Sequence, residues 1–346
     1  MGSQLNIRQF IEDRESHLSP YAFKSIRSKG RQKEEGLCSI RTVFQRDRDR
    51  IIHSKSFRRL KHKTQVFIAP SGDHYVTRLT HTLEVSQLAR TLARALNLNE
   101  DLTEAISLGH DLGHTPFGHI GEDVLNELYF KGFKHYEQSL RVVDLLENDG
   151  KGLNLTQEVR DGILNHSKSG EDIFGQKWTS TSTLEGDVCK IADTIAYINH
   201  DIGDAIRAGI INEDKLPNSA TKILGHSHRE RINKMVCDII ENSWDTSGFA
   251  VAANKPTIRM SPKIANATNE LRYFLFNNVY EIISTRPEAL KAREVVSRLY
   301  HYFVTHYDQL PIEYLFSGVG VERSAVDYIA GMTDQYALQL NDSLST

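Results

Sequence analysis

Apolar residues along this chain recur mostly at helical spacing. Leu79, Leu83, Leu88, Leu92 and Leu96 are four or five residues apart, which predicts one apolar stripe along a helix. A second helix is predicted over 100–112, where an acidic start leads into a mostly apolar run. The same reasoning predicts further helices over 121–132, 136–149, 156–165, 185–207, 226–243, 263–284, 286–306 and 322–340.

Strand patterns are scarce by comparison. The best candidate is the segment TQVFIA at 64–69, followed by the turn sequence PSGD. Two polar stretches, 168–183 and 246–257, are predicted to be surface loops and are too short to separate domains. We therefore expect an all-α fold with at most a short hairpin, organised as a single domain over 1–346.

Composition narrows the class of protein. The net charge of −3 over 346 residues gives no global field that would favour nucleic acid or a membrane. Three isolated cysteines, Cys38, Cys189 and Cys237, fit a reducing compartment rather than a disulfide framework. The chain has no apolar run of about 18 residues, and its start lacks a basic segment followed by an apolar one. We expect a cytoplasmic protein that does not span a membrane.

One segment departs from this even charge balance. Within 41–63, nine residues are basic: Arg41, Arg46, Arg48, Arg50, Lys55, Arg58, Arg59, Lys61 and Lys63. One interpretation is a solvated helix face whose charges are paired with nearby acids. The other is a cradle for a polyanion.

The segment GHDLGHTPFGH at 109–119 is the densest in metal-capable side chains. His110 and Asp111 stand at the end of an apolar helix, which alone could be an ordinary polar pair. Imidazole with carboxylate suits Mn, Fe, Co, Ni or Zn, and suits Mg less well. His81 opens the preceding helix, and Asp193 lies in an otherwise apolar helix, where a charge is costly unless it is paired or bound to metal. The order of these four residues describes a cage that holds one divalent ion.

At this point the chain resembles the HD-domain deoxynucleoside triphosphate triphosphohydrolases, the bacterial dGTPase and dGTPase-like group. The resemblance runs from about residue 44 to 336 and is carried by RDRDRIIHSKSFRRLKHKTQVF, DHYVTRLTHTLEV, GHDLGHTPFGHIGE, KHYEQSLRVV, GILNHS, IADTIAYINHDIGDAI and AVDYIAGMTDQYA. It implies an HD-type helical bundle with a metal core at about 44–207 and a helical C-terminal part at 208–346. It also implies hydrolysis of dNTP to deoxynucleoside and inorganic triphosphate by attack at the α-phosphate. The implied metal ligands are His81, His110, Asp111 and Asp193.

The proposed reaction needs a proton donor for the leaving 5′-oxygen. Glu122 follows His119 by three residues, so a helix would place both on one face, where the carboxylate could fix the imidazole tautomer. From spacing alone, a surface pair is the more common reading. The resemblance implies instead that His119, Glu122 and His135 are catalytic. His135 and Glu137 form a second His/acid pair in the sequence, and Tyr136 between them departs from the Asn common in the family.

Several residues are implied to bind substrate. His114 could share the face of His110 as a fifth ligand, but Gly113 and Pro116 indicate that the helix ends there. The resemblance instead places His114 and Arg78 on phosphate. It places Gln65 and Asp201 on the 3′-hydroxyl, Tyr197 against the sugar and Tyr280 where a 2′-hydroxyl would lie. His166 is placed near the substrate without a role.

Alternatives stay open at this stage. A 5′-deoxynucleotidase or a cyclic-nucleotide phosphodiesterase would share the cage, and a regulatory nucleic-acid-binding module would explain the basic segment. The resemblance also implies a homo-oligomer, with dNTP as an allosteric effector and single-stranded DNA as a modulator. Neither the preferred base nor the native metal (Mn, Mg, Co, Ni, Fe or Zn) follows from these residues.

Overall fold

A computed structural model describes residues 6–68, 75–167, 172–174, 180–250, 255–315 and 319–344. Regular structure among these residues is helical, with two isolated β-bridges, Arg31–Thr156 and Thr64–Thr77. The all-α prediction is confirmed. No helix in these ranges has both the length and the apolar character needed to cross a membrane. The α-helices are α1 (Ile7–Arg14), α2 (Val43–Ile52), α3 (Lys55–Arg59), α4 (Arg78–Ala95), α5 (Glu100–Gly109), α6 (His119–Leu128), α7 (His135–Arg141), α8 (Glu147–Gly150), α9 (Gln157–Asn165), α10 (Leu184–Arg207), α11 (Asn218–Leu224), α12 (His228–Asn242), α13 (Pro262–Leu275), α14 (Glu281–Ser284), α15 (Pro287–Thr305), α16 (Val321–Ala330) and α17 (Asp334–Ser343).

Most predicted helices are present, with shifted ends. The helix predicted over 100–112 stops at Gly109, and the one predicted over 322–340 is two helices, α16 and α17, separated at Gly331. The strand predicted over 64–69 is not formed where it can be described, since Thr64 makes only an isolated bridge. Residue 69 and the turn at 70–73 lie outside the described residues. Helices α1, α2, α3 and α11 were not predicted.

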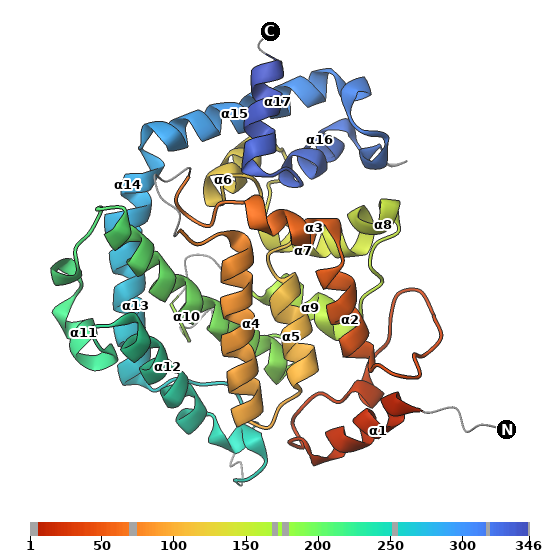
Figure 1. The fold of residues 1–346 in the computed structure, drawn as a ribbon, viewed down its shortest axis with the longest axis vertical. Coiled ribbons are helices and arrows are strands. Elements are labelled where there is room, and N and C mark those ends of the chain that lie inside the picture. Colours follow the sequence, from red (N-terminus) through yellow and green to blue (C-terminus); the bar gives the residue numbers. More distant parts are fainter. Residues whose placement is uncertain are drawn as a thin grey trace.

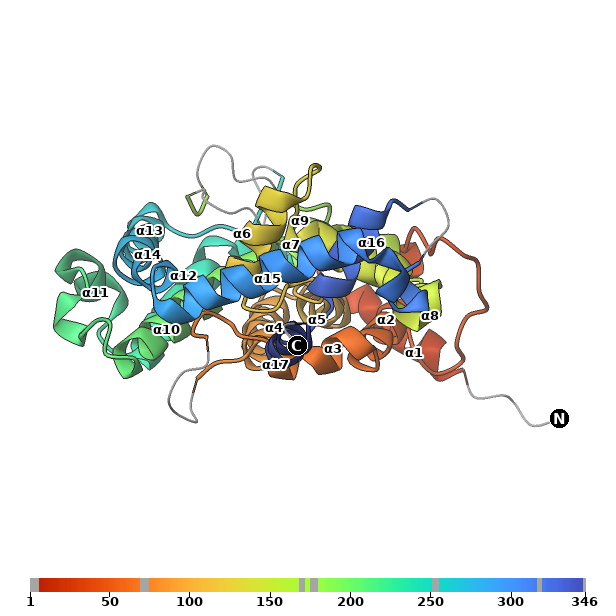
Figure 2. The same ribbon diagram turned by 90° about the horizontal axis from the view of Figure 1, so that it is seen from above.

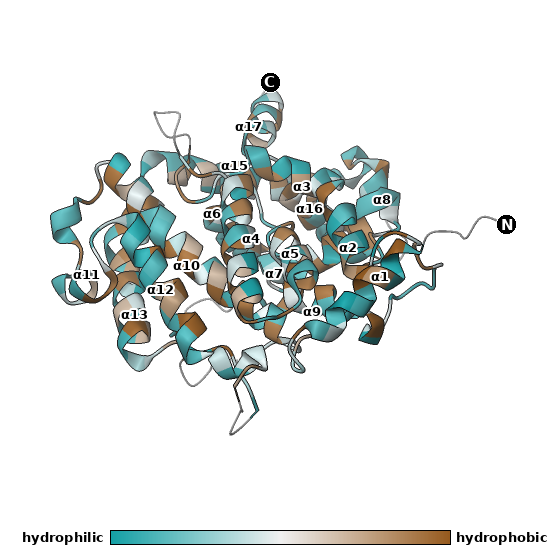
Figure 3. Cartoon of the chain, turned by 60° about the horizontal axis from the view of Figure 1, so that its bottom comes forward, coloured by the Kyte–Doolittle hydropathy of each residue, from teal (hydrophilic) through white to brown (hydrophobic). Residues whose placement is uncertain are grey.

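Helices α4, α5 and α10 form the centre of the larger hydrophobic core. Figure 1 shows α4 and α5 side by side in the middle of the molecule, with α10 running obliquely past them. Helices α2 and α9 pack on α5, and α12 and α13 pack on α10. Apolar residues gather on the faces that these helices turn toward one another, and polar residues lie outside (Figure 3).

The predicted apolar stripe of α4 is wrong in one respect. Leu88, Leu92 and Leu96 are buried, whereas Leu83 is 51% exposed. Five residues rotate the chain by about 140° around a helix axis beyond a full turn, so Leu83 and Leu88 cannot share a face. The buried face at this end of α4 instead carries His81, Thr82 and Val85.

A second hydrophobic cluster joins the C-terminal helices to the segment 117–133. Phe117, Leu125 and Phe133 pack there with residues of α15, α16 and α17. Seen from above, α15 runs across the molecule, and it packs on α6 (Figure 2). The C-terminal helices therefore touch the segment that follows Asp111, and this contact crosses the predicted division at residue 207.

Candidate active site

Four side chains from three helical segments converge at the centre of the larger core. His81 lies in the first turn of α4, His110 and Asp111 directly follow α5, and Asp193 lies within α10. His81 Nε2 is 3.1 Å from Asp193 Oδ1 and 3.7 Å from Asp111 Oδ2. His110 Nε2 is 3.5 Å from Asp111 Oδ1 and 4.0 Å from Asp193 Oδ1. The structure thus brings together the four predicted metal ligands, which we call the cage.

His110 and Asp111 lie where α5 ends, and His110 keeps helical backbone angles, φ −61° and ψ −40°. Neighbouring residues of a regular helix diverge by about 100°. The last helical residue of α5 is Gly109, so His110 and Asp111 lie in the turn beyond it. Gly113 continues this turn with its Cα packed against the backbone of α7, where an added Cβ would lie 2.1 Å from the amide nitrogen of Ser139. Only glycine fits this contact.

The cage imidazoles are oriented as metal ligands usually are. His110 Nδ1 lies 2.6 Å from the carbonyl oxygen of Ser107, which places the proton on Nδ1. His110 Nε2 is left buried with no hydrogen-bond partner. His81 Nδ1 lies 2.9 Å from His200 Nε2, so its Nε2 faces the carboxylates. An unpaired buried nitrogen beside two carboxylates fits a divalent ion as the missing partner.

Charge in the cage also suits a cation. Burial alone would raise the pKa of Asp193, but His81 and His110 lower it to about 2. Burial likewise works against the ionised form of Asp111, yet His110 and Arg78 bring its pKa well below the usual range. Burial lowers the pKa of His81. At neutral pH the cage therefore offers ionised carboxylates and a neutral His81, the forms that bind metal.

Arg78 lies one turn before His81, as predicted, and points into the same site. Its Nη1 donates to Asp111 Oδ2 at 2.8 Å, and this ion pair is buried. Its Nε donates to the carbonyl oxygen of Thr64 and its Nη2 to that of Gln65. The guanidinium therefore links the cage to the segment that carries Gln65. Its predicted contact with phosphate stays a prediction.

Glu122 contacts the other two predicted catalytic residues, His119 and His135. Its Oε2 lies 3.0 Å from His119 Nδ1 and 3.0 Å from His135 Nδ1. Its Oε1 also accepts the backbone N–H of His135 at 2.9 Å. The predicted pair of His135 with Glu137 is wrong, because His135 turns inward to Glu122 while Glu137 is exposed. Residues two apart on a helix point in different directions.

These contacts set the protonation of the group. Burial would raise the pKa of Glu122, but His135 and the hydrogen bond from His119 hold it well below the usual range. Burial lowers the pKa of His135, but the charge of Glu122 outweighs this and raises it. The His119 side chain is 62% exposed, whereas that of Glu122 is only 9% exposed. The ionised carboxylate of Glu122 thus contacts one buried imidazole, that of His135, and one solvent-exposed imidazole, that of His119.

His114 lies between the cage and this group. Its ring stacks on His135 with centroids 4.3 Å apart and meets His119 edge-on at 5.0 Å. Burial, with Arg78 nearby, keeps the pKa of His114 well below its ordinary value. Its Nδ1 is buried without a partner. The helix has ended by this point, as Gly113 and Pro116 indicated, so His114 does not share the face of His110.

Hydrogen bonds to residues of the C-terminal helices fix the turn that leads to His119. Phe117 and Gly118 both have left-handed backbone angles, φ 61° and φ 59°, which are unfavourable for Phe117. Asp334 Oδ1 accepts the N–H of Phe117 at 2.9 Å, and its Oδ2 accepts the N–H of Thr64 at 2.9 Å. The buried Lys63 donates to the carbonyl oxygens of His114 and Ala330. Sequence reasoning did not assign a role to Asp334 or Lys63.

The predicted sugar-binding residues come from three places: Tyr197 and Asp201 from α10, Tyr280 from the helical turn 276–280, and Gln65 from the segment before α4. Tyr280 donates its hydroxyl to Asp201 Oδ2 at 2.6 Å. Asp201 Oδ1 and Gln65 Oε1 are buried and have no hydrogen-bond partner. Tyr197 lies one turn before Asp201 and is half-buried. The structure brings Tyr280 to Asp201 and leaves two buried acceptor oxygens, one on Asp201 and one on Gln65.

Two histidines near the cage were missed or left without a role. His200 contacts His81 and, on its other side, lies 2.8 Å from Asp201 Oδ1 without hydrogen-bond alignment. His166 Nε2 lies 3.9 Å from Asp111 Oδ1, and its Nδ1 is 2.7 Å from the carbonyl oxygen of Ile163. Burial lowers the pKa of His166 to about 3, so it is neutral. His200 follows Asp193 by seven residues, two helical turns, and that spacing was the available signal.

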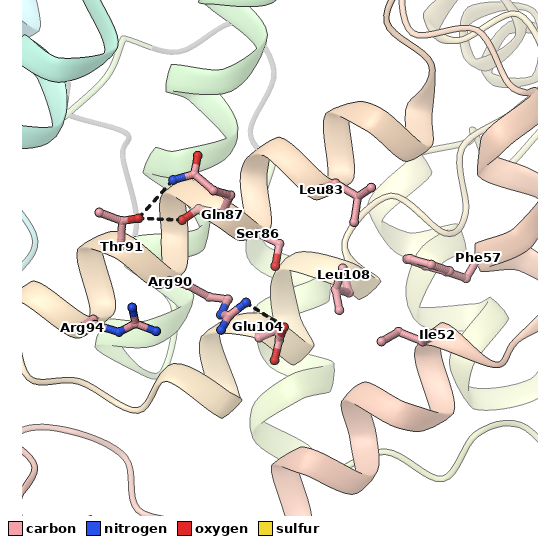
Figure 4. Close-up of a pocket in the computed structure, with 10 residues that line it drawn as sticks. All are labelled: Ile52, Phe57, Leu83, Ser86, Gln87, Arg90, Thr91, Arg94, Glu104 and Leu108. Carbon is pink, nitrogen blue, oxygen red and sulfur yellow. Dashed lines mark hydrogen bonds and ion pairs between the residues drawn. The ribbon is translucent and has the colours of Figure 1, made fainter. Parts of the chain in front are cut away.

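A separate groove lies on the outer side of α4, away from the cage (Figure 4). Its volume is about 450 Å³. Arg90 and Arg94, the arginines that line it, are paired with Glu100 at 2.7 and 2.6 Å, so the groove offers little free positive charge. None of the predicted site residues is among its described lining, which is Ile52, Phe57, Leu83, Ser86, Gln87, Arg90, Thr91, Arg94, Glu104 and Leu108.

Five of the nine basic residues within 41–63 form ion pairs with described residues: Arg41, Arg46, Arg48, Arg50 and Lys55. Arg46 and Arg50 both contact Glu35, at 3.1 and 2.6 Å. Arg41 contacts Asp49 at 2.6 Å, and Arg48 lies 2.9 Å from the same carboxylate. These contacts favour the interpretation of a paired, solvated face for residues 41–50, whereas Arg58, Arg59 and Lys61 pair with no acid among the described residues.

Comparison with known proteins places this arrangement in a family. Residues 78–198 match the HD domain, and residues 258–343 match a phosphohydrolase-associated domain. A deoxyguanosinetriphosphate triphosphohydrolase-like protein from Caldanaerobacter subterraneus subsp. tengcongensis is 58% identical over 337 residues, 96% of this chain and 94% of that protein. The chain belongs to the deoxyguanosinetriphosphate triphosphohydrolase-like family. Proteins with the same description from Desulfatibacillum aliphaticivorans and Clostridium perfringens are each 50% identical, covering 96% of this chain and 96% and 95% of those proteins.

Membership confirms the resemblance drawn from the motifs, and with it that the chain is a hydrolase. The HD domain runs from the start of α4 into α10 and contains all four cage residues. The phosphohydrolase-associated domain contains Tyr280 and Asp334. Both matched regions of this triphosphohydrolase-like protein therefore contribute to one site.

Proposed function

We propose that the protein hydrolyses deoxynucleoside triphosphates to deoxynucleoside and inorganic triphosphate, by attack at the α-phosphate and with a divalent ion in the cage. The observation that carries the proposal is the closeness of two different groups. Ligand atoms of Asp111, from the cage, and of His135, from the group around Glu122, lie within 4.8 Å of each other and of His166. A phosphate held at the cage would therefore have a proton-carrying group beside it.

His81, His110, Asp111 and Asp193 would hold the ion, as the unpaired Nε2 of His110 suggests. When bound, a divalent ion supplies Lewis-acid polarisation of the phosphate and lowers the pKa of a water ligand. A donor set of two histidines and two aspartates accepts several of the six ions named above.

His119 would give a proton to the leaving 5′-oxygen. Glu122 accepts from Nδ1 of His119, so the opposite nitrogen, Nε2, is directed away from the carboxylate. A carboxylate on one nitrogen stabilises the charged imidazolium and fixes its orientation. Because His119 is open to solvent, it can reload its proton between turnovers. His135 and His114 would line the phosphate side of the same group.

Recognition of the sugar would use two acceptors for the 3′-hydroxyl. One is Gln65 Oε1, which has no hydrogen-bond partner, and the other is Asp201 Oδ1, which lies 2.8 Å from His200 Nδ1. Tyr280, fixed on Asp201, and Tyr197 would occupy the space beside C2′. A 2′-hydroxyl would meet an aromatic ring there and lose its hydrogen bonds, which disfavours ribonucleotides. Arg78 would contact a phosphate oxygen from the cage side.

Partners beyond the substrate rest on the resemblance alone. A dNTP effector, single-stranded DNA and a homo-oligomer remain proposals of that kind. Light scattering with and without dNTP tests the oligomer.

The decisive experiment crosses four dNTPs with Mg²⁺, Mn²⁺, Co²⁺ and Ni²⁺ and identifies products by chromatography. We expect tripolyphosphate and deoxynucleoside, and a rate reduced by about 10²–10⁴-fold in His119→Ala. His53→Ala is the matched control, since His53 is exposed in the turn after α2. Pyrophosphate and monophosphate as the products would refute the proposal. Release of phosphate from dAMP, without tripolyphosphate from any dNTP, would identify a 5′-deoxynucleotidase instead.

A further inference from the structure

The group around Glu122 is itself a set of metal donors. One ligand atom from each of His114, His119, Glu122 and His135 lies within 4.8 Å of the others. None of these residues belongs to the cage. The acid–base role proposed above uses their protons, and once those protons leave, the same atoms offer lone pairs to a cation. We call these four residues the second donor set.

Two of its donor–donor distances are close to those of a tetrahedral site. With metal–ligand distances of about 2.0–2.1 Å, two donors of a tetrahedral zinc ion are roughly 3.3 Å apart. Glu122 Oε2 is 3.0 Å from Nδ1 of His119 and 3.0 Å from Nδ1 of His135. Small ring rotations would open these contacts enough to admit an ion. His114 supplies the fourth donor: one of its ring nitrogens lies within 4.8 Å of the other three ligand atoms, and its Nδ1 is buried without a hydrogen-bond partner.

The donor atoms and the route of access limit which ions can bind at the second donor set. Three imidazoles with one carboxylate suit Zn²⁺, Co²⁺, Ni²⁺ or Cu²⁺ far better than Mg²⁺ or Ca²⁺. His114, Glu122 and His135 are buried, while the His119 side chain is 62% exposed. An ion can therefore enter past His119 and end among three fixed donors.

We propose that the second donor set is a second metal site for Zn²⁺ or a similar borderline ion, and that its occupancy switches the hydrolase off. On binding, the ion forms bonds to the imidazole nitrogens and to Glu122, and the protons held between them leave to solvent. No oxidation or reduction occurs. With the ion on Nδ1, His119 cannot become an imidazolium, and its remaining Nε2–H is too weak an acid to protonate a leaving group. This last consequence rests on the function proposed above, whereas the binding of the ion does not.

Ion counting tests the site without any substrate. Metal-free protein is dialysed against Zn²⁺ and the bound ions are counted by mass spectrometry of the metal. We expect two ions per wild-type chain. We expect one per chain in His119→Ala, and one in Asp193→Ala, which retains the second donor set but not the complete cage. The spectrum of bound Co²⁺ should show the visible bands of a tetrahedral site in Asp193→Ala.

His119→Ala is the informative variant because an exposed side chain can be removed without harm to the fold. The loss of a direct ligand should weaken the second ion by more than the about 10–100-fold that loss of an outer partner costs. His119→Cys restores a zinc donor without the imidazole, so it should again bind two ions. One ion in the wild type, or a second ion unaffected in His119→Ala, would overturn the site.

The proposed inhibition is tested separately, by the rate of hydrolysis. Protein with Mn²⁺ in the cage is assayed on dNTP while Zn²⁺ is added, and a weak chelator is then used to remove it. We expect kcat to fall as the occupancy of the second donor set rises, and to recover when that ion is removed, with KM little changed. Two bound ions with undiminished hydrolysis would overturn the inhibition alone. Absence of any dNTP hydrolysis would overturn the proposed function, and the ion count would still stand.

Discussion

Replacement of Asp334 by alanine should damage a site that is more than 200 residues away in sequence. Asp334 begins α17, and its carboxylate accepts hydrogen bonds from the backbone N–H groups of Thr64 and Phe117 and from the Thr64 hydroxyl. Phe117 is held in the left-handed region at φ 61°, two residues before His119. The carboxylate is thus the partner that fixes an unfavourable turn.

The expected magnitude follows from the groups left behind. A buried N–H that loses its acceptor costs about 1–3 kcal/mol, and Asp334→Ala orphans two of them. Relaxation of the strained turn returns part of this, since such backbone strain costs about 1–3 kcal/mol. We expect the free energy of unfolding to fall by about 2–4 kcal/mol. A turn that relaxes by about 1 Å would misplace His119 and reduce kcat by roughly 10²-fold.

Urea denaturation measures the stability, and steady-state hydrolysis below the unfolding range measures kcat. Asp342→Ala is the control, because Asp342 is an exposed acid on the same helix. Asp334→Asn retains one acceptor oxygen and should lie between the two. If Asp334→Ala matches Asp342→Ala in both stability and kcat, the argument that α17 holds the turn is refuted.

Three further substitutions or labels test other features. Burial raises the pKa of Glu185 to about 7 from its ordinary 4.5. Its protonated form therefore stabilises the fold below pH 4.5, and this contribution is lost as the pH rises through 7. Relative to Glu185→Gln, the wild type should lose about 3 kcal/mol over that window, and a difference that does not change with pH would contradict this. Backbone N–H groups lower the pKa of Cys38 to about 7 while burial raises that of Cys189 to about 12. Alkylation followed by mass spectrometry should label Cys38 with a midpoint near pH 7 and leave Cys189 unlabelled; equal labelling would show that reasoning wrong. Gly113→Ala forces a Cβ into the backbone of α7, so it should lower the free energy of unfolding by several kcal/mol and remove most of the activity. An unchanged midpoint of urea denaturation would contradict this.

Much of the fold could be predicted because its signals are local. Periodicity located the central helices, and the apolar surroundings of Asp193 marked a charge that needs a partner. The periodicity of apolar residues gave a wrong result at Leu83, where a spacing of five residues was counted as one helix face. It also gave no prediction for short, charged helices such as α2 and α3. Such helices owe their stability to packing, which a local pattern does not contain.

The site shows the same limit more sharply. His119 and Glu122 are three residues apart, so their contact could be anticipated, and it is present at 3.0 Å. The contact of His135 with the same carboxylate spans 13 residues. That of Asp334 with Thr64 spans 270. Contacts of this length depend on how helices pack, so no spacing rule could indicate them.

The two donor sets differ in what already occupies their nitrogens. In the cage, His110 gives its Nδ1 to a backbone carbonyl and leaves Nε2 with no partner. In the second donor set, the Nδ1 atoms of His119 and His135 already share protons with Glu122. In the cage one imidazole–carboxylate contact, His81 with Asp193 at 3.1 Å, has such a proton to lose, whereas an ion entering the second set must displace the protons of two contacts with the ionised Glu122. Metal binding that releases protons is weaker at a given pH. The cage should therefore fill first, and only an excess of an ion that prefers imidazole should fill the second set.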